Sequence, residues 1–233
     1  MIKKKIQIEG IPAIIWGVES KRVFIAVHGN GSNKEDTVIE LLARQAVANG
    51  YQVLSFDLPG HGEYRKRVDM SKVETYINDL NIIMRVAQNR WRKVSLFACS
   101  MGTYFSLQAY KEIHLERVLF LSPVVNMLDL IEGMMKGTGV TEQELEKEQT
   151  IATPMGMNLY WSYYSYVKAH PITSWDPPTY ILYGGKDMMC ARYRVEAFAE
   201  QFECKLRIDE SAEHYFYTKE QLESYIRWLD ATI

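Results

Sequence analysis

The sequence predicts an α/β fold with a mostly parallel central sheet flanked by helices. Short apolar runs alternate along the chain with amphipathic helical stretches, which is typical of strands joined by crossover helices. The chain has 233 residues, a length that suits one domain with a large core. Its 47% hydrophobic and 24% charged residues exclude collagen-like, coiled-coil and disordered classes. We therefore expect a single domain over residues 1–233.

Six short apolar runs are expected to form most of the sheet. Five of them have the composition of strands buried on both faces, and the last is weaker. The predicted strands are residues 23–27, 53–56, 94–97, 118–121, 180–183 and 206–208. An alternating segment around Glu9 and Gly10 predicts a β-hairpin ahead of them.

Three helices carry capping-box spacings that predict where they begin. These pairs are Ser32 with Glu35, Ser71 with Glu74, and Thr218 with Gln221. Apolar residues recur at helical spacing after the second and third pairs, so each helix is expected to lay one stripe on the sheet. Gly50 is expected to end the first helix in a left-handed conformation.

About fifty residues, 126–175, separate two strands that a short crossover would normally join. We expect this segment to be a helical cap, inserted after the sixth strand and belonging to the same domain. It contains a glutamate-rich predicted helix followed by methionines and aromatic residues. The aromatic residues are Tyr160, Trp161, Tyr163, Tyr164 and Tyr166.

Composition and charge exclude several partners and cofactors. The formal charge of -2 provides no basic field for nucleic acid, which we do not expect as a partner. Three scattered cysteines form neither a disulfide framework nor a zinc-type pair, so we expect no metal and no cofactor. Lys3–Lys5 precede an interrupted apolar segment that does not qualify as a signal peptide, and no run of ~18 apolar residues occurs. A cytoplasmic location is expected.

The most informative segment is Ala98–Gly102, which lies between a predicted strand and a predicted helix. A nucleophilic serine on a tight strand-to-helix turn requires small residues two positions before and after it, and Ala98 and Gly102 satisfy this for Ser100. Small-x-Ser-x-Gly is also a common chance string, so the position and the partners decide. Cys99 is a rival nucleophile, but Phe97 and Met101 are too large to flank it in such a turn.

A serine nucleophile requires a base, and His214 is the best placed of five histidines. It follows the last predicted strand, in a loop before the final helix. The other histidines lie upstream of the serine, at the end of the helix after it, or in the insertion; they are His28, His61, His114 and His170.

The residue that orients the histidine is expected to be Asp187. It follows Gly184 and Gly185 at the carboxyl end of a predicted strand, where the glycines would let the chain turn sharply. Asp176 precedes that strand and lies at the wrong end. Asp129 follows the preceding strand by several residues and stays a weaker alternative.

Two backbone N–H groups are expected to face a developing oxyanion, those of Asn30 and Met101. Asn30 lies in the glycine-rich segment His28–Gly31 after a central strand, which could equally be an ordinary βα turn. No phosphate-binding glycine pattern is present. Asp57–Gly62 is expected to be a structural turn without chemistry.

In element order and in the order Ser, Asp, His, the chain from Lys21 onward resembles the α/β-hydrolase family, most of all small esterase and lipase-like members with a helical cap. The resemblance implies Ser100 as nucleophile, His214 as base and Asp187 as orienting acid, with the Asn30 and Met101 amides as oxyanion hole. One departure is Ala98, where the family's turn usually has glycine.

We expect a serine hydrolase that cleaves a small carboxylic ester with an apolar acyl or alcohol group. The aromatic residues of the insertion are expected to present apolar surface above Ser100. A thioesterase or an acyltransferase would use the same residues, and a non-catalytic ligand-binding module is the alternative from another class. Acyl length, physiological substrate and oligomeric state are not determined by the sequence.

Overall fold

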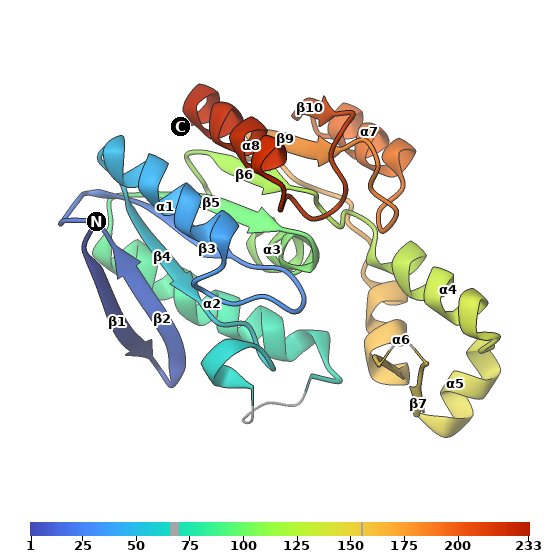
Figure 1. Cartoon of the computed structure of the whole chain (residues 1–233). Coiled ribbons are helices and arrows are strands. Elements are labelled where there is room, and N and C mark those ends of the chain that lie inside the picture. The colour runs from blue at the N-terminus through green and yellow to red at the C-terminus, as the bar shows by residue number, and fades with distance from the viewer. Residues whose placement is uncertain (66–69, 155) are drawn as a thin grey trace.

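The computed structural model describes residues 1–65, 70–154 and 156–233, and within them eight strands form one sheet (Figure 1). The strands lie in the order β1-β2-β4-β3-β5-β6-β9-β10. Only β2 runs antiparallel to its neighbours, β1 and β4, so the predicted mostly parallel sheet is confirmed. Their bounds are β1 Lys3–Ile8, β2 Ile11–Trp16, β3 Arg22–Val27, β4 Gln52–Phe56, β5 Lys93–Cys99, β6 Val118–Leu121, β9 Thr179–Gly184 and β10 Lys205–Asp209.

Helices cover both faces of the sheet, as buried parallel strands require. Buried residues of α1 and α8 pack on one face, and those of α2, α3 and α7 pack on the other. The bounds are α1 Thr37–Ala48, α2 Val73–Arg90, α3 Met101–Tyr110, α7 Arg192–Gln201 and α8 Lys219–Thr232. In the described part of the chain, no helix is long and apolar enough to cross a membrane.

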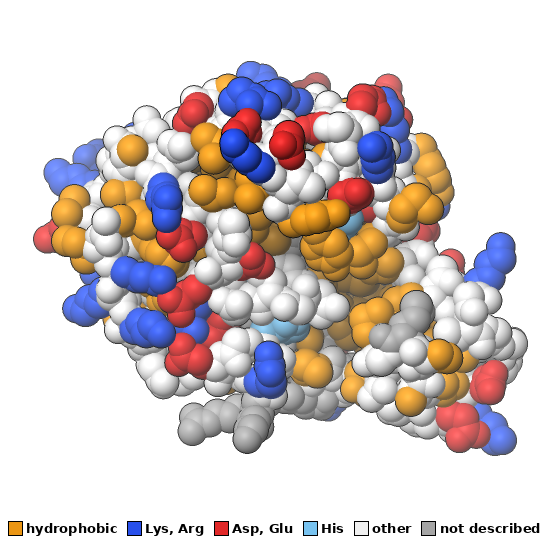
Figure 2. All heavy atoms as spheres, in the orientation of Figure 1, with side chains coloured by type: hydrophobic (Ala, Val, Ile, Leu, Met, Phe, Trp, Pro, Cys, Tyr) orange, Lys and Arg blue, Asp and Glu red, His pale blue; other side chains and the backbone are white. Residues whose placement is uncertain are grey.

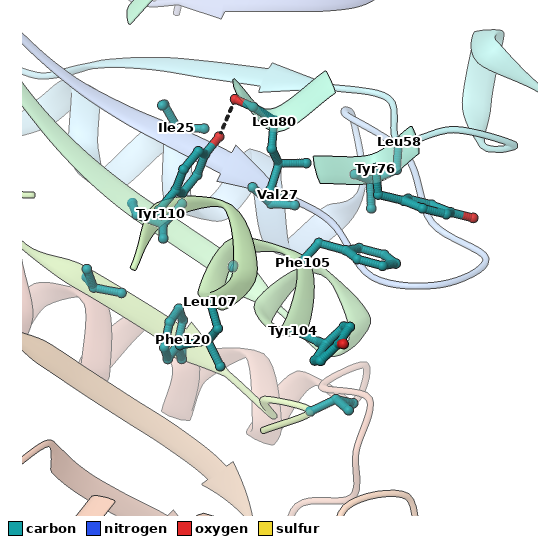
Figure 3. Packing of buried hydrophobic residues seen from close by; sticks show 14 of the residues in the cluster. Ile25, Val27, Leu58, Tyr76, Leu80, Tyr104, Phe105, Leu107, Tyr110 and Phe120 are labelled. Atoms are coloured by element: carbon teal, nitrogen blue, oxygen red, sulfur yellow. Dashed lines mark hydrogen bonds between the residues drawn. The ribbon is translucent and has the colours of Figure 1, made fainter. Parts of the chain in front are cut away.

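The larger core lies between the sheet and helices α2 and α3 (Figure 3). Tyr76 of α2 stacks on Phe105 of α3 with ring centroids 4.1 Å apart. The buried hydroxyl of Tyr110 donates a hydrogen bond of 2.8 Å to the carbonyl of Leu80, so this large ring enters the core without an unpaired polar group. These contacts fix α3, whose first residue follows Ser100.

The three predicted capping boxes have different outcomes. Thr218 and Gln221 form the box that opens α8, as predicted. Ser32 does not cap α1, because that helix begins five residues later and the Ser32 hydroxyl bonds to Asp36 instead. The predicted start at Ser71 is also wrong: α2 begins at Val73, with Lys72 at its N-cap position. Spacing alone does not reveal where the backbone turns into the helix.

The segment between β6 and β9 projects from the body of the molecule (Figure 1). Besides the expected helices it contains a two-stranded hairpin. Its elements are α4 Met127–Thr138, α5 Glu142–Glu148, β7 Thr150–Ala152, β8 Asn158–Tyr160 and α6 Trp161–Ala169. Their buried residues continue the core under α3, where Tyr163 packs edge-on against Phe105.

A buried histidine joins the loops that follow β3 and β4. The N–H of Leu58 donates a hydrogen bond of 2.9 Å to Nε2 of His28. Because Nε2 accepts this bond, the ring proton is on Nδ1, which lies 2.7 Å from the Gly29 carbonyl. Burial lowers the pKa of His28 to about 4. His28 is therefore a neutral structural residue at neutral pH.

A buried ion pair reinforces the same junction. The Asp57 carboxylate accepts hydrogen bonds from the backbone N–H of Lys34, at 2.9 Å, and from its Nζ, at 2.6 Å. It also accepts one from the N–H of Glu63 at 2.9 Å. Both charged side chains are almost fully buried, so removing one partner would leave the other uncompensated. The loop that carries Gly29 and Asn30 is thus anchored at both its ends.

The low pKa of His28 predicts a measurable pH dependence of stability. The unfolded state has the ordinary pKa of 6.5 and binds a proton more readily than the folded state, so stability falls as pH drops from 6.5 towards 4. Between pH 7 and pH 5 this group should remove about 2 kcal/mol. His28→Gln keeps a side-chain donor and acceptor. In urea unfolding, the variant should therefore lose about 2 kcal/mol less unfolding free energy between pH 7 and pH 5 than the wild-type protein does. An equal pH dependence in both proteins would show that His28 is not buried in its neutral form.

Candidate active site

Ser100 lies at a strained turn between β5 and α3. Its backbone angles are φ 51° and ψ −127°, a region that costs a non-glycine residue on the order of 1–3 kcal/mol. The residues two positions before and after Ser100 are small for steric reasons. Ala98 is fully buried between β3 and β6, and a Cβ on Gly102 would lie 2.4 Å from the carbonyl oxygen of His28. The serine is thereby held close to the loop after β3.

Ser100, His214 and Asp187 form a continuous chain of hydrogen bonds. The hydroxyl of Ser100 lies 2.7 Å from Nε2 of His214, and Nδ1 of His214 lies 2.7 Å from Oδ2 of Asp187. The side chains of the histidine and the aspartate are 4% and 0% exposed, so water competes little for these bonds. A carboxylate only accepts, which places the ring proton on Nδ1 and leaves Nε2 free to accept the Ser100 proton.

The Asp187 carboxylate is itself held by the backbone. Its Oδ1 accepts hydrogen bonds from the N–H groups of Met189, at 2.7 Å, and Cys190, at 3.1 Å. This arrangement is a turn closed by an aspartate side chain, as short polar residues commonly form. Because Oδ1 is occupied, Oδ2 faces His214 in a fixed direction.

The glycines before Asp187 act by close packing and not by an unusual turn. The chain does turn here, since the N–H of Asp187 donates a hydrogen bond of 3.0 Å to the Gly184 carbonyl, but neither Gly184 nor Gly185 has a positive φ. A Cβ on Gly184 would lie 2.2 Å from the Glu213 carbonyl oxygen, and one on Gly185 would lie 2.7 Å from Cα of Glu210. The two glycines therefore let the loop before α8 pack directly on the end of β9, which brings His214 to Asp187.

The alternative aspartates lie elsewhere. Asp129 forms an ion pair with Arg194 at 2.5 Å, and Asp176 is an exposed residue ahead of β9. Among the remaining histidines, His170 stacks on Tyr166 of α6 at 4.0 Å. His114 is exposed in the loop after α3.

Cys99 is poorly suited to be a nucleophile. Burial raises the pKa of its thiol to about 12, so almost none of it is the reactive thiolate at neutral pH. It packs in the core beneath α1 and α8 with other apolar side chains. Ser100 is therefore the better candidate of the two.

The side chain of Asn30 makes two contacts that the sequence does not predict. Its side-chain amide lies 3.1 Å from Nε2 of His61, whose Nδ1 is 2.8 Å from the Pro59 carbonyl. On its other side the amide lies 3.8 Å from the sulfur of Met157, a residue of the segment between β6 and β9. His61, in the turn expected to be purely structural, thus helps to position this loop. No spacing in the sequence pairs these residues.

A cavity of about 280 Å³ opens beside Ser100 and His214. It lies towards α1 and the loop before α8, and its described lining residues include none from 126–175. The lining residues are Gly29, Asn30, Ser32, Asp36, Thr37, Val38, Cys99, Ser100, Leu121, Ser122, His214, Tyr215, Phe216, Tyr217 and Leu222. The expectation that the insertion's aromatic residues line the pocket at Ser100 is not met for this cavity.

Those aromatic residues instead hold the insertion together or against α3. Tyr163 packs on Phe105, and Tyr164 donates a hydrogen bond of 3.1 Å to Glu142. A second cavity of about 310 Å³ lies between α4, α6 and α7, lined among others by Tyr104 and Phe198. Figure 2 shows hydrophobic side chains around the hollow between the body of the sheet and the projecting segment.

Solved structures with low sequence identity share the whole fold. Est1E from Butyrivibrio proteoclasticus, solved with bound ferulic acid, superposes with a TM-score of 0.78 at 17% identity, covering 98% of this chain and 96% of that one. The α/β hydrolase domain-containing protein 10 from mouse gives 0.78 at 14% identity, with 99% and 98% covered. An esterase from Pyrococcus furiosus gives 0.71 at 18% identity, with 99% and 91% covered.

Sequence comparison identifies the family. No curated protein matches the chain. The family model described as serine aminopeptidase, S33, matches residues 18–157, which is more than half of the sequence and includes β3, the strained serine turn, and α4, α5 and β7 of the projecting segment. The chain therefore belongs to this family of α/β hydrolases.

Proposed function

We propose that the protein is a serine hydrolase that cleaves small carboxylic esters through an acyl-enzyme at Ser100. The observation that carries the proposal is the buried hydrogen-bond chain from Ser100 through His214 to Asp187. Such a chain supplies the base that a serine hydroxyl needs at neutral pH. The strain at Ser100 supports the same role, since a residue with only a packing function has no need of that backbone conformation.

The first half of the reaction forms the acyl-enzyme. Nε2 of His214 takes the Ser100 proton as Oγ attacks the ester carbonyl carbon, and a tetrahedral oxyanion forms. His214 then returns the proton to the departing alcohol as the carbon–oxygen bond breaks. Asp187 stabilises the cationic ring during these steps and keeps Nδ1 protonated, because its Oδ2 accepts from that atom.

The oxyanion would be stabilised at the start of α3. Met101 is the first residue of that helix, and the first N–H groups of a helix have no intrahelical partner. We assign the second donor to the backbone N–H of Asn30, whose loop is held by His28, Lys34 and His61. Removal of one such donor typically slows a reaction by about 10²–10³-fold.

Deacylation repeats the same steps with water as the attacking group. His214 takes a proton from water, and Ser100 leaves as its hydroxyl is restored. A thioester would react by the same route with a thiolate as leaving group. The cavity of about 280 Å³ is near the lower end of the range for ligand pockets, ~300–1,000 Å³, so a short acyl group fits it best.

We assign residues 126–175 the role of a cap over the site. The contact between Met157 and Asn30 supports this assignment, because it connects the segment to the proposed oxyanion loop. The apolar residues Leu121 and Phe216 at the cavity wall fit an apolar acyl or alcohol group. The segment would then restrict access to Ser100 from one side.

Substitution of the serine tests the proposed nucleophile. Ser100→Ala should abolish labelling by a fluorophosphonate and lower ester hydrolysis by about 10³-fold or more, while the fold is retained. Intact-mass analysis measures the labelling, and circular dichroism checks the fold. Cys99→Ala, the adjacent thiol variant, should label to full stoichiometry. Full labelling of Ser100→Ala would place the nucleophile on another residue.

Two further variants test the proposed base and its orienting acid. Asp187→Asn should lower kcat by about 10⁴-fold, because an amide at this position favours the wrong ring tautomer of His214. His214→Ala should be similarly impaired. His61→Ala should lose only about tenfold, since it removes a contact to Asn30 and leaves one oxyanion donor intact. Initial rates on 4-nitrophenyl acetate measure all three, and equal damage in His61→Ala and His214→Ala would contradict the assignment.

A further inference from the structure

The cavity beside Ser100 has an apolar interior and a polar rim. Its buried wall includes Leu121 and Phe216, which are 3% and 5% exposed. Its more accessible residues include Ser32, Asp36 and Tyr217. A ligand that fills the cavity would therefore have its apolar part inside and meet polar groups near the opening.

Asp36 is the only carboxylate among the described residues that line this cavity. It occupies the N-cap position of α1, yet its side chain makes no capping hydrogen bond to that helix. The carboxylate accepts the hydroxyl of Ser32 instead. A carboxylate has about four lone-pair sites, so one such bond leaves most of its accepting capacity for a ligand.

Aromatic residues line the same cavity as Asp36. Tyr215, Phe216 and Tyr217 are consecutive lining residues, and the two tyrosines are 56% and 66% exposed. Tyrosines that line the same cavity as a carboxylate suit a cation, because the faces of aromatic rings attract positive charge. No lysine or arginine occurs among the described lining residues, so Asp36 has no cationic partner within the cavity.

A buried hydroxyl at the cavity wall adds a second polar group. Ser122 follows β6 with a positive φ of 43° and is 2% exposed. Its Oγ has no hydrogen-bond partner in the described part of the structure. Buried hydroxyls normally have partners, so an unpaired one at a cavity wall indicates a place for a polar ligand group.

From this combination we propose that the cavity binds a cationic group, such as an ammonium, carried by the ester substrate within reach of Ser100. This inference rests on the proposed ester hydrolysis and narrows its substrate class. Asp36 would select for the charge, while Tyr215 and Tyr217 would contact the alkyl groups around it. A carboxylate at the start of α1 would also interact with the helix dipole, but that interaction predicts no preference for a cationic ligand.

A pair of ligands of equal shape tests the charge preference directly. Choline and 3,3-dimethylbutan-1-ol differ in that a quaternary nitrogen replaces a carbon. Isothermal titration calorimetry on the wild-type protein should show choline binding about tenfold more tightly, as expected for a carboxylate and aromatic rings acting together. Equal affinities, or tighter binding of the neutral alcohol, would overturn the proposal without any variant being needed.

Two charge-matched variants then locate the preference. Asp36→Asn should reduce the ratio of affinities to about threefold or less, because the aromatic contacts stay and the charge is lost. Glu40→Gln removes an equal charge from the same helix, at a residue that pairs with Arg44 outside the cavity, and should leave the ratio unchanged. An equal loss in both variants would show a general field effect and overturn the assignment to Asp36.

The reaction at Ser100 is measured separately. Choline should slow fluorophosphonate labelling of the wild-type protein at concentrations where 3,3-dimethylbutan-1-ol does not. If Ser100 is never labelled, the proposed hydrolysis fails, whereas calorimetry still decides whether the cavity prefers a cation. If Ser100 is labelled and choline neither binds preferentially nor protects, the cation proposal alone fails.

Discussion

A buried hydrogen bond of 2.7 Å joins His214 to Asp187 across two loops that are distant in sequence. Each loop follows a different strand, so the contact exists only because β9 and β10 pair in parallel and end at the same edge of the sheet. The Asp187 carboxylate is fixed by two backbone N–H groups, and the other loop is fixed by its packing on Gly184 and Gly185. The direction of His214 follows from these contacts, and with it the position of the acceptor for the Ser100 proton.

The remaining parts of the site depend on the same edge. Ser100 follows β5, and the loop with Gly29 and Asn30 follows β3. Gly102 permits close approach of α3 to that loop, since a side chain there would collide with the His28 carbonyl. His28 and the Lys34–Asp57 pair are buried, and they hold the loop whose backbone N–H we propose as a donor to the oxyanion.

Local sequence patterns predicted much of this arrangement. Short apolar runs predict the strands, and the small residues around Ser100 predict the turn. Both features depend on residues that are close together in the sequence. The order Ser, Asp, His along the chain predicts that Asp187 and His214 lie on loops at the same edge of the sheet as Ser100. The predicted helix starts at Ser32 and Ser71 are wrong. The two residues of a capping box bond to the backbone only where it already has the geometry of a helix N-terminus.

Features that depend on tertiary contacts could not be predicted. The packing role of Gly184, the contact of His61 with Asn30 and the cavity on the α1 side all join segments that are remote in sequence. The aromatic residues of the insertion could equally have lined a pocket or a core, because both are rich in aromatic side chains. The structure places Tyr163 against Phe105, which is a packing role.

A crystal structure of the protein after reaction with a small dialkyl fluorophosphonate would decide whether Ser100 is the nucleophile, because it shows both the bonded atom and the donors to the phosphoryl oxygen. We expect phosphorus bonded to Oγ of Ser100, the phosphoryl oxygen within hydrogen-bond distance of the backbone N–H groups of Met101 and Asn30, and Nε2 of His214 still beside Oγ. Phosphorus on another residue, or a phosphoryl oxygen directed away from the start of α3, would contradict this expectation.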